Sequence, residues 1–256
     1  MGNIFTKSLV IDFSIQWLMF LIAAYLRTEK FYDLTGSPTF IILALRSLLT
    51  ASRFFPRQVI QTCLVSTWAV RLGLFLFVRV MQAGKDSRFN KVRGNPKLFF
   101  IYWTIQGLWV FATLLPTLIL NAKQDDRPIG YRDYVGWGLW LAGVLIESIA
   151  DFQKYNFRQD PSNKDKWIST GLWSIVRFPN YLGEILLWTG LYLSASSTFK
   201  GVWEHTAVIS PIFVALLLTQ LSGIPILERQ NLKRWKDNAE FMRYFKNTYR
   251  LIPYIY

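Results

Sequence analysis

The stretch Gly171-Leu-Trp-Ser-Ile-Val-Arg-Phe-Pro-Asn-Tyr-Leu-Gly-Glu184 brings an arginine, a Pro-Asn pair and a glutamate to the start of a strongly apolar segment. Charged side chains beside hydrocarbon are costly, and by default they indicate a functional site. Pro179 favours an extended residue before it and a helix after it, so that Asn180 either caps this helix or reaches a ligand. Glu184 follows one turn later on the same helix face. A capped helix start without a ligand is the alternative interpretation.

The composition is typical of a protein that crosses a membrane several times. Of the 256 residues, 52% are hydrophobic and 17% are aromatic, including 11 Trp. The chain has one cysteine, Cys63, and one histidine, His205. A disulfide within the chain and a metal site built on thiolates or imidazoles are therefore excluded, and we expect no metal ion.

Seven apolar segments predict an all-α integral membrane protein, with about seven transmembrane helices in one bundle and a single membrane domain over residues 1–256. The second segment is short for a bilayer crossing, so its helix must tilt, extend into its flanks or be partly covered. The fifth is expected to continue as a helix to about Arg158. The segments are 9–26, 40–50, 59–80, 98–120, 134–150, 181–197 and 206–227.

The basic residues between these segments predict the orientation of the chain. With the N-terminus outside, the loops on the cytosolic side carry 19 Lys and Arg residues and the opposite loops carry 7. This excess places the N-terminus in the lumen or exterior and the C-terminus in the cytosol, as in an endoplasmic reticulum protein of a eukaryote. The net charge of +13 then reflects topology and attraction to anionic head groups or phosphorylated cofactors. We expect the lipid bilayer as a partner and no nucleic acid.

A polar stripe is expected at the end of the fifth segment. Glu147, Asp151, Lys154 and Arg158 follow one another at helical spacing on one face. The stripe is either a ladder of salt bridges within the helix or a polar wall. Such a wall would bind a phosphorylated or ribose-bearing ligand at the cytosolic mouth of the bundle.

Two arginines interrupt the third apolar segment. Arg79 either reaches the cytosolic interface by snorkelling or binds a ligand. Arg71 lies two turns deeper and needs a partner such as Glu29 or Asp33 from the first cytosolic loop. The C-terminal tail mixes aromatic and basic residues and predicts an amphipathic helix at the interface. The polar stripe, the basic loop after the third segment, the Pro-Asn entry to the sixth segment and the tail all lie on the cytosolic side. Together they predict a cofactor cavity there.

The chain resembles the steroid 5α-reductase superfamily, in particular its branch of membrane proteins with the reductase-like C-terminal domain. The resemblance covers nearly the whole chain and is strongest over residues 134–256. It is carried by Gly171-Leu-Trp, Arg177-Phe-Pro-Asn180-Tyr-Leu-Gly183-Glu184, Asp151 with Arg158, Gly223-Ile-Pro with Glu228, Trp235, Tyr244 and Leu251-Ile-Pro253.

The resemblance implies a seven-helix bundle that binds NADPH from the cytosol. Such a protein reduces a C=C bond conjugated to a carbonyl in a small lipophilic substrate, a lipid or a steroid-like molecule. Arginines suit the phosphate groups, and carboxylates suit the ribose hydroxyls or the nicotinamide amide. The cofactor contacts implied by position are Asp151, Arg158, Asn180 and Glu184, with Arg79, Arg88, Arg229 and Tyr244 as further ones.

The resemblance also implies hydride transfer to the β-carbon, a donor that stabilises the enolate at the carbonyl, and protonation of the α-carbon. In the steroid reductases the donor is a Tyr–Glu pair from early helices. This chain departs from that pattern, because residues 59–80 contain no tyrosine and Arg71 stands in its place. The catalytic candidates are therefore Arg71, Glu29 and Tyr32, with Asp33 and Tyr102 nearby.

Two other functions are compatible with the sequence. Membrane methyltransferases that use S-adenosylmethionine share an Arg-His-Pro-x-Tyr element, but this chain has Phe178 in place of the histidine. It also has the single Glu228 where a Glu-Glu pair is frequent. A lipid-binding protein that keeps the fold without catalysis is the other alternative.

Overall fold

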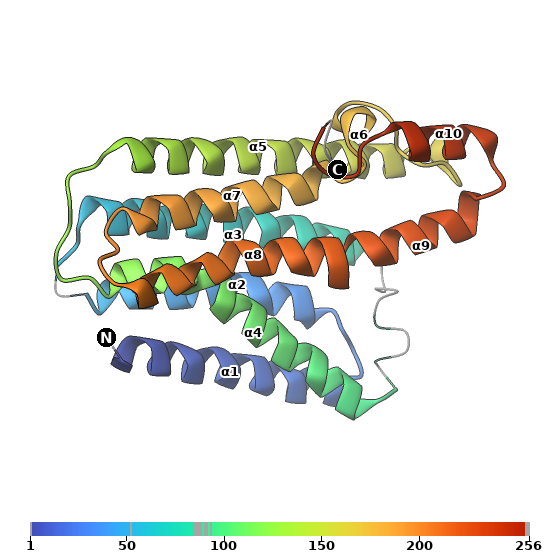
Figure 1. Cartoon of the computed structure of the whole chain (residues 1–256). Coiled ribbons are helices and arrows are strands. Elements are labelled where there is room, and N and C mark those ends of the chain that lie inside the picture. Colours follow the sequence, from blue (N-terminus) through green and yellow to red (C-terminus); the bar gives the residue numbers. More distant parts are fainter. Residues whose placement is uncertain (1, 52, 84–88, 90–91, 93, 254–256) are drawn as a thin grey trace. The chain divides into compact units, whose positions relative to one another are not determined.

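The computed structural model describes residues 2–51, 53–83, 89, 92 and 94–253. The described residues are helical apart from turns, loops and one isolated parallel bridge, between Val176 and Tyr249 (Figure 1). The chain divides into two compact units. The first unit comprises Met1–Tyr131 and Ser194–Ser210, and the second comprises Arg132–Leu193 and Pro211–Tyr256. The expected single domain remains a prediction.

The first unit packs four long helices around an aromatic core. The side chain of Phe40 meets those of Trp68 and Trp109 edge to face, with ring centroids 5.0 and 4.9 Å apart. The helix predicted at 40–50 begins earlier than expected, so it extends into its flank as its short apolar run requires. The helices are α1 (Gly2–Tyr25), α2 (Phe31–Leu49), α3 (Pro56–Ala83) and α4 (Pro96–Asn121), and the segment 194–210 adds the 3₁₀ turn η3 (Val202–Val208).

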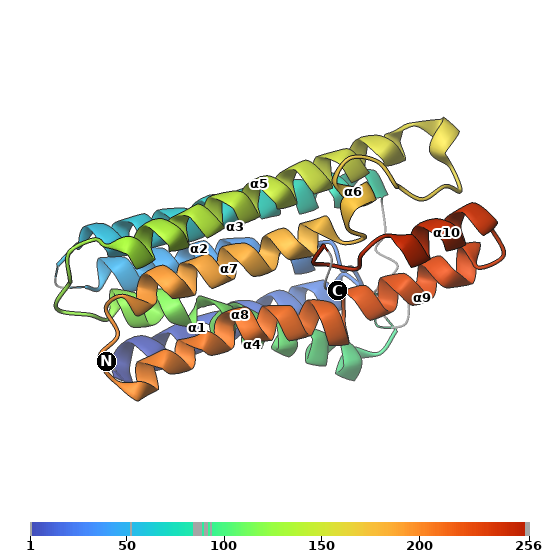
Figure 2. The same cartoon turned by 45° about the horizontal axis from the view of Figure 1, so that its top comes forward.

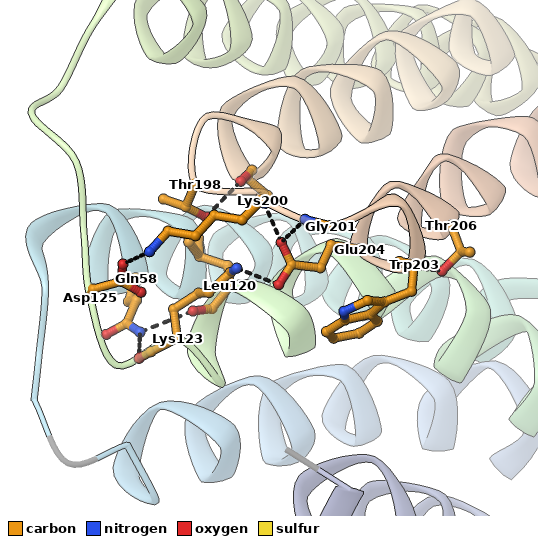
Figure 3. Close-up of polar contacts among 11 residues, drawn as sticks. Gln58, Leu120, Lys123, Asp125, Thr198, Lys200, Gly201, Trp203, Glu204 and Thr206 are labelled. Carbon is orange, nitrogen blue, oxygen red and sulfur yellow. Dashed lines mark hydrogen bonds and ion pairs between the residues drawn. The ribbon is translucent and has the colours of Figure 1, made fainter.

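The segment 194–210 is held in the first unit by a polar cluster beside the end of α4 (Figure 3). Lys123 and Glu204 form an ion pair, and both side chains are only 4% exposed. The Glu204 carboxylate also accepts hydrogen bonds from the backbone N–H groups of Lys200 (2.6 Å) and Gly201 (3.4 Å). Lys200 in turn pairs with Asp125 at the surface. A buried charge is thus fully matched, which fixes the segment in place.

The second unit is built on two long antiparallel helices, α5 and α7, that run side by side in both views (Figure 1, Figure 2). Helix α5 continues to Gln159, which confirms the predicted extension, and α7 begins at Pro179 as predicted. The elements are α5 (Tyr131–Gln159), η2 (Pro161–Asn163), α6 (Leu172–Ile175), α7 (Pro179–Ser196), α8 (Ile209–Leu216), the π turn η4 (Leu217–Leu221), α9 (Ile224–Trp235) and α10 (Ala239–Asn247).

Glycines allow the backbones of α5 and α7 to touch. A Cβ placed on Gly143 would lie 2.5 Å from the carbonyl oxygen of Gly183, and a Cβ on Gly183 would lie 2.5 Å from that of Gly143. Small residues at such crossings permit close packing where the hydrophobic effect does not drive helices together. The crossing lies one turn from Glu147 and directly before Glu184, so it also sets the spacing of the polar side chains on both helices.

Among the described residues, five helical segments are long and apolar enough to cross a membrane. They are Ile4–Tyr25, Pro56–Met81, Pro96–Asn121, Tyr131–Gln159 and Val202–Trp235. The chain is therefore an all-α membrane protein, as predicted. Crossings by α2 and α7, which would complete the expected seven, remain predictions.

Candidate functional site

The segment before α7 is anchored on α5. Gly171 has φ = 61°, and a Cβ at this position would collide with the side-chain amide of Gln153. The oxygen of the Gln153 amide accepts a hydrogen bond from the backbone N–H of Leu172 at 3.0 Å. One residue further, the Trp173 indole donates to the carbonyl oxygen of Ala150 at 3.0 Å. The sequence Gly-Leu-Trp therefore fixes the short helix α6 against α5.

Asn180 does not cap α7; its side chain reaches α5 instead. Its Nδ2 donates to Oδ1 of Asp151 at 3.3 Å, and its Oδ1 is buried without a hydrogen-bond partner among the described residues. Glu184, one turn further along α7, accepts a hydrogen bond from the indole of Trp188 at 2.9 Å. Asp151 and Glu184 are 6% and 9% exposed. The structure thus brings together two of the predicted contacts, Asp151 and Asn180, and leaves one amide oxygen for a ligand or water.

A cavity of about 580 Å³ lies in the second unit between the end of α5, the following loop, α9 and α10. Its size is that of a ligand pocket. Arg158 and Tyr244 line it, and Arg88 lies outside the described residues. The other predicted cofactor contacts on this unit do not line the cavity; they are Asp151, Asn180, Glu184 and the exposed Arg229.

The cavity wall carries Lys154 of the predicted polar stripe, together with cations and indoles that were not predicted as site residues. Lys164 and Lys166 come from the loop after α5, where the sequence analysis counted them only as topology signals. Lys154 lies over the ring of Trp173, with its Nζ 4.5 Å from the ring centroid. Trp167 adds a second indole to the wall. Phosphates and flat rings are the groups that such a wall accommodates.

Arg177 closes one side of this cavity and was not among the predicted site residues. Its Nη2 donates to Glu228 at 2.6 Å, and its Nη1 donates to the carbonyl oxygen of Phe245. The guanidinium lies 4.1 Å from the centroid of the Phe245 ring. Burial lowers the pKa of Arg177, and the carboxylate of Glu228 opposes that shift. The motif arginine is therefore held by protein groups from the C-terminal region.

Tyr244 is also held by the protein. Its hydroxyl donates to the carbonyl oxygen of Trp173 at 2.7 Å, and burial raises its pKa to about 12. The hydroxyl thus stays protonated at neutral pH and ties α10 to α6. Its ring still lines the cavity, so its contact with a ligand would be made through the ring face.

The catalytic candidates lie in the first unit. The Tyr32 hydroxyl donates to the carbonyl oxygen of Tyr102 at 3.0 Å, and Glu29 is buried. Asp33 pairs with Arg79 at 3.0 Å, so the carboxylate considered for Arg71 is engaged by the arginine two turns away. The three proposed catalytic roles, and that of Arg79 toward a cofactor, remain predictions.

Arg71 lies on an open face of α3, beside Ser66, Thr67, Val70 and Leu74. The Arg71 guanidinium lies 5.7 Å from the centroid of the Phe75 ring. Its catalytic role remains a prediction.

The chain is similar to parts of proteins that are named as a steroid dehydrogenase, an enoyl-CoA reductase and a probable methyltransferase. It is 39% identical over 77 residues to 3-oxo-5-alpha-steroid 4-dehydrogenase 1 of Macaca fascicularis, which covers 30% of this chain and 29% of that protein. It is 29% identical over 97 residues to the very-long-chain enoyl-CoA reductase of Dictyostelium discoideum, covering 38% and 32%. It is 26% identical over 145 residues to the probable O-methyltransferase ustE of Ustilaginoidea virens, covering 50% and 49%.

Each of these matches spans less than half of the related protein. No solved structure matches the chain. A family model described as "Protein of unknown function (DUF1295)" matches residues 19–248, which is most of the chain. The chain therefore belongs to the DUF1295 family, within the steroid 5-alpha-reductase-like superfamily.

Proposed function

We propose that this protein is a membrane-embedded, NADPH-dependent reductase that acts on a C=C bond conjugated to a carbonyl in a lipid or steroid-like substrate. Membership of the superfamily supports the reductase class, and two of the relatives are named for oxidoreduction of a steroid and of an enoyl-CoA. The observation that carries the proposal is the basic, indole-lined cavity beside the Arg-Phe-Pro-Asn-Tyr segment.

The residues of this cavity fit a dinucleotide phosphate. Lys154, Arg158, Lys164 and Lys166 supply cationic donors for its phosphate groups, and the indole of Trp167 suits a stacked adenine. Beyond the cavity, Asp151 and Asn180 offer a carboxylate and a free amide oxygen, which suit hydroxyl or amide donors. When bound, NADPH supplies the hydride.

Arg71, Glu29 and Tyr32 are the residues that we propose to act on the substrate. Arg71 carries a permanent charge and several N–H donors, so it suits the developing negative charge on the carbonyl oxygen. The Tyr32 hydroxyl carries an exchangeable proton for the α-carbon, and Glu29 is proposed to act beside it. Binding of the carbonyl oxygen and delivery of the proton are thus assigned to different side chains, unlike in a Tyr–Glu pair.

Methyl transfer from S-adenosylmethionine is the second candidate function. The O-methyltransferase relative matches half of the chain. In addition, Arg177 of the Arg-x-Pro-x-Tyr element contacts Glu228, so the two features that the methyltransferases share with this chain lie together in the structure. Lipid binding without catalysis is the third candidate function.

A thermal-shift titration of the detergent-purified protein with NADPH, NADH and S-adenosylmethionine tests these functions. We expect NADPH at 100 times its Kd to stabilise the protein by about 2.7 kcal/mol, because a ligand that binds only the folded state shifts the unfolding equilibrium. Stabilisation by S-adenosylmethionine alone would replace the reductase with the methyltransferase. Stabilisation by none of the three ligands would favour the non-catalytic alternative.

We also propose an endoplasmic reticulum location in a eukaryote, with a lumenal N-terminus and a cytosolic C-terminus. The asymmetry of the basic residues supports this orientation. A glycosylation acceptor fused to the C-terminus is expected to remain unmodified in eukaryotic cells. Modification of that acceptor would reverse the orientation.

A further inference from the structure

Three segments that are distant in the sequence meet at Arg177. The backbone N–H of Arg177 donates to the carbonyl oxygen of Tyr249 at 2.8 Å, next to the parallel bridge between Val176 and Tyr249. Its side chain reaches Glu228 on α9 and the backbone of Phe245 on α10. The start of α7, helix α9 and the C-terminal tail are thus joined through a single residue.

Glu228 is the shared acceptor in this cluster. Arg250 donates to both of its carboxylate oxygens, from Nε to Oε1 at 3.0 Å and from Nη2 to Oε2 at 2.9 Å, while Arg177 donates to Oε1 at 2.6 Å. The side chains of Arg177 and Glu228 are each 11% exposed, and that of Arg250 is 36% exposed. Charge-assisted, bidentate contacts of this kind are strong and geometrically specific.

An apolar contact reinforces the same junction. Leu251, directly after Arg250, is buried against Phe178 and Ile224. Phe178 stacks on Tyr181 in the first turn of α7, with ring centroids 5.6 Å apart. The tail therefore packs on the residues that lead into α7, and these residues precede Asn180 by two to four positions.

We propose that Glu228 and Arg250 are positioning residues that act through Arg177. They hold residues 173–180 against the C-terminal tail, and this contact fixes both the cavity wall and the Asn180–Asp151 pair. Arg177 and Glu228 line the cavity, whereas Arg250 is not among its lining residues. An effect of Arg250 on a ligand in this cavity is therefore expected to pass through its contact with Glu228. The expected effect on NADPH affinity rests on the proposed function. The junction itself rests on the structure alone.

The experiment compares Arg250→Gln with Arg250→Lys in detergent-purified full-length protein. NADPH affinity, measured below the unfolding temperature of every variant, is expected to fall about tenfold to a hundredfold in Arg250→Gln through loss of charge-assisted bonds. Arg250→Lys keeps the charge and is expected to recover part of this loss. Arg243→Gln, an exposed arginine of α10 outside the cavity lining, is the matched control and is expected to bind NADPH as the wild type does.

Hydrogen exchange without ligand tests the junction independently of NADPH. In Arg250→Gln the amides of residues 173–178, including that of Arg177, are expected to exchange faster, while those of the first unit are unchanged. Unchanged exchange in this segment would overturn the proposal, as would an equal loss of NADPH affinity in Arg243→Gln. If the wild type does not bind NADPH, the proposed function fails, and the exchange result still decides whether Arg250 positions the segment.

Discussion

Glu204→Ala is expected to lower the free energy of unfolding by about 3–5 kcal/mol, the largest loss that we expect from a single side chain. Removal of one partner of a buried ion pair leaves the other charge without compensation. Here Lys123 would lose its counterion with only 4% of its side chain exposed. The substitution also removes the acceptor for the backbone N–H groups of Lys200 and Gly201. Equilibrium unfolding in mixed micelles measures the difference.

Two further variants separate this effect from the loss of any surface charge. The double variant Lys123→Met/Glu204→Leu is expected to be more stable than Glu204→Ala, because apolar side chains of similar volume replace a buried ion pair at little cost. Asp125→Ala breaks the neighbouring pair with Lys200, whose side chains are about half exposed, and it is expected to change stability little because solvent screens the pair. Equal losses in Glu204→Ala and Asp125→Ala would contradict the burial argument.

Gly183→Leu is expected to destabilise the second unit by more than about 1–3 kcal/mol, the usual cost of overpacking. The atoms that its Cβ would meet are the carbonyl oxygen of Gly143 at 2.5 Å and the backbone nitrogen of Glu147 at 2.7 Å, and backbone cannot rotate away as a side chain can. Helices α5 and α7 must separate, which also moves Asn180 from Asp151. Thermal unfolding and NADPH affinity are both expected to fall.

Gly138, a glycine of α5, provides the control for this prediction. A Cβ on Gly138 meets no heavy atom within 4 Å, so Gly138→Leu adds the same side chain to open space. Gly183→Ala is expected to give an intermediate loss, since it adds only the Cβ. Similar stability of Gly138→Leu and Gly183→Leu would show that the two helices do not cross at Gly183.

The parts of the fold that sequence predicted well have local causes. Pro179 sets the start of α7 because its ring disfavours a helical residue before it. Helix α5 continues to Gln159, as the helical spacing from Glu147 to Arg158 predicted. The apolar segment 40–50 covers only part of α2, because Thr35-Gly-Ser-Pro38 before it is not apolar. In the structure these residues lie within the helix, where Thr35 Oγ1 donates to the carbonyl oxygen of Phe31 at 2.6 Å and most of the stretch is buried. Tertiary packing overrides the local preference.

In the candidate site, too, some contacts could be predicted from the sequence, whereas those set by tertiary packing could not. The contact between Asn180 and Asp151 joins the Pro-Asn pair to the polar stripe of α5, both of which the sequence predicts on the cytosolic side. The partners of the Arg177 side chain were not predictable, because Glu228 and Phe245 lie 51 and 68 positions away and no helical spacing relates them. The lysines of the loop after α5 were noticed only as charges, since a loop sequence does not show which side chains face a cavity.

The ion pair between Lys123 and Glu204 has a consequence for biosynthesis. The two residues lie 81 positions apart, and the segment that carries Glu204 completes the first unit only after α5 and α7 have been made. During translation Lys123 therefore leaves the ribosome well before its counterion. The nascent chain must keep this ammonium group hydrated until residues 194–210 arrive, so the first unit cannot mature at the membrane before most of the chain has been synthesised.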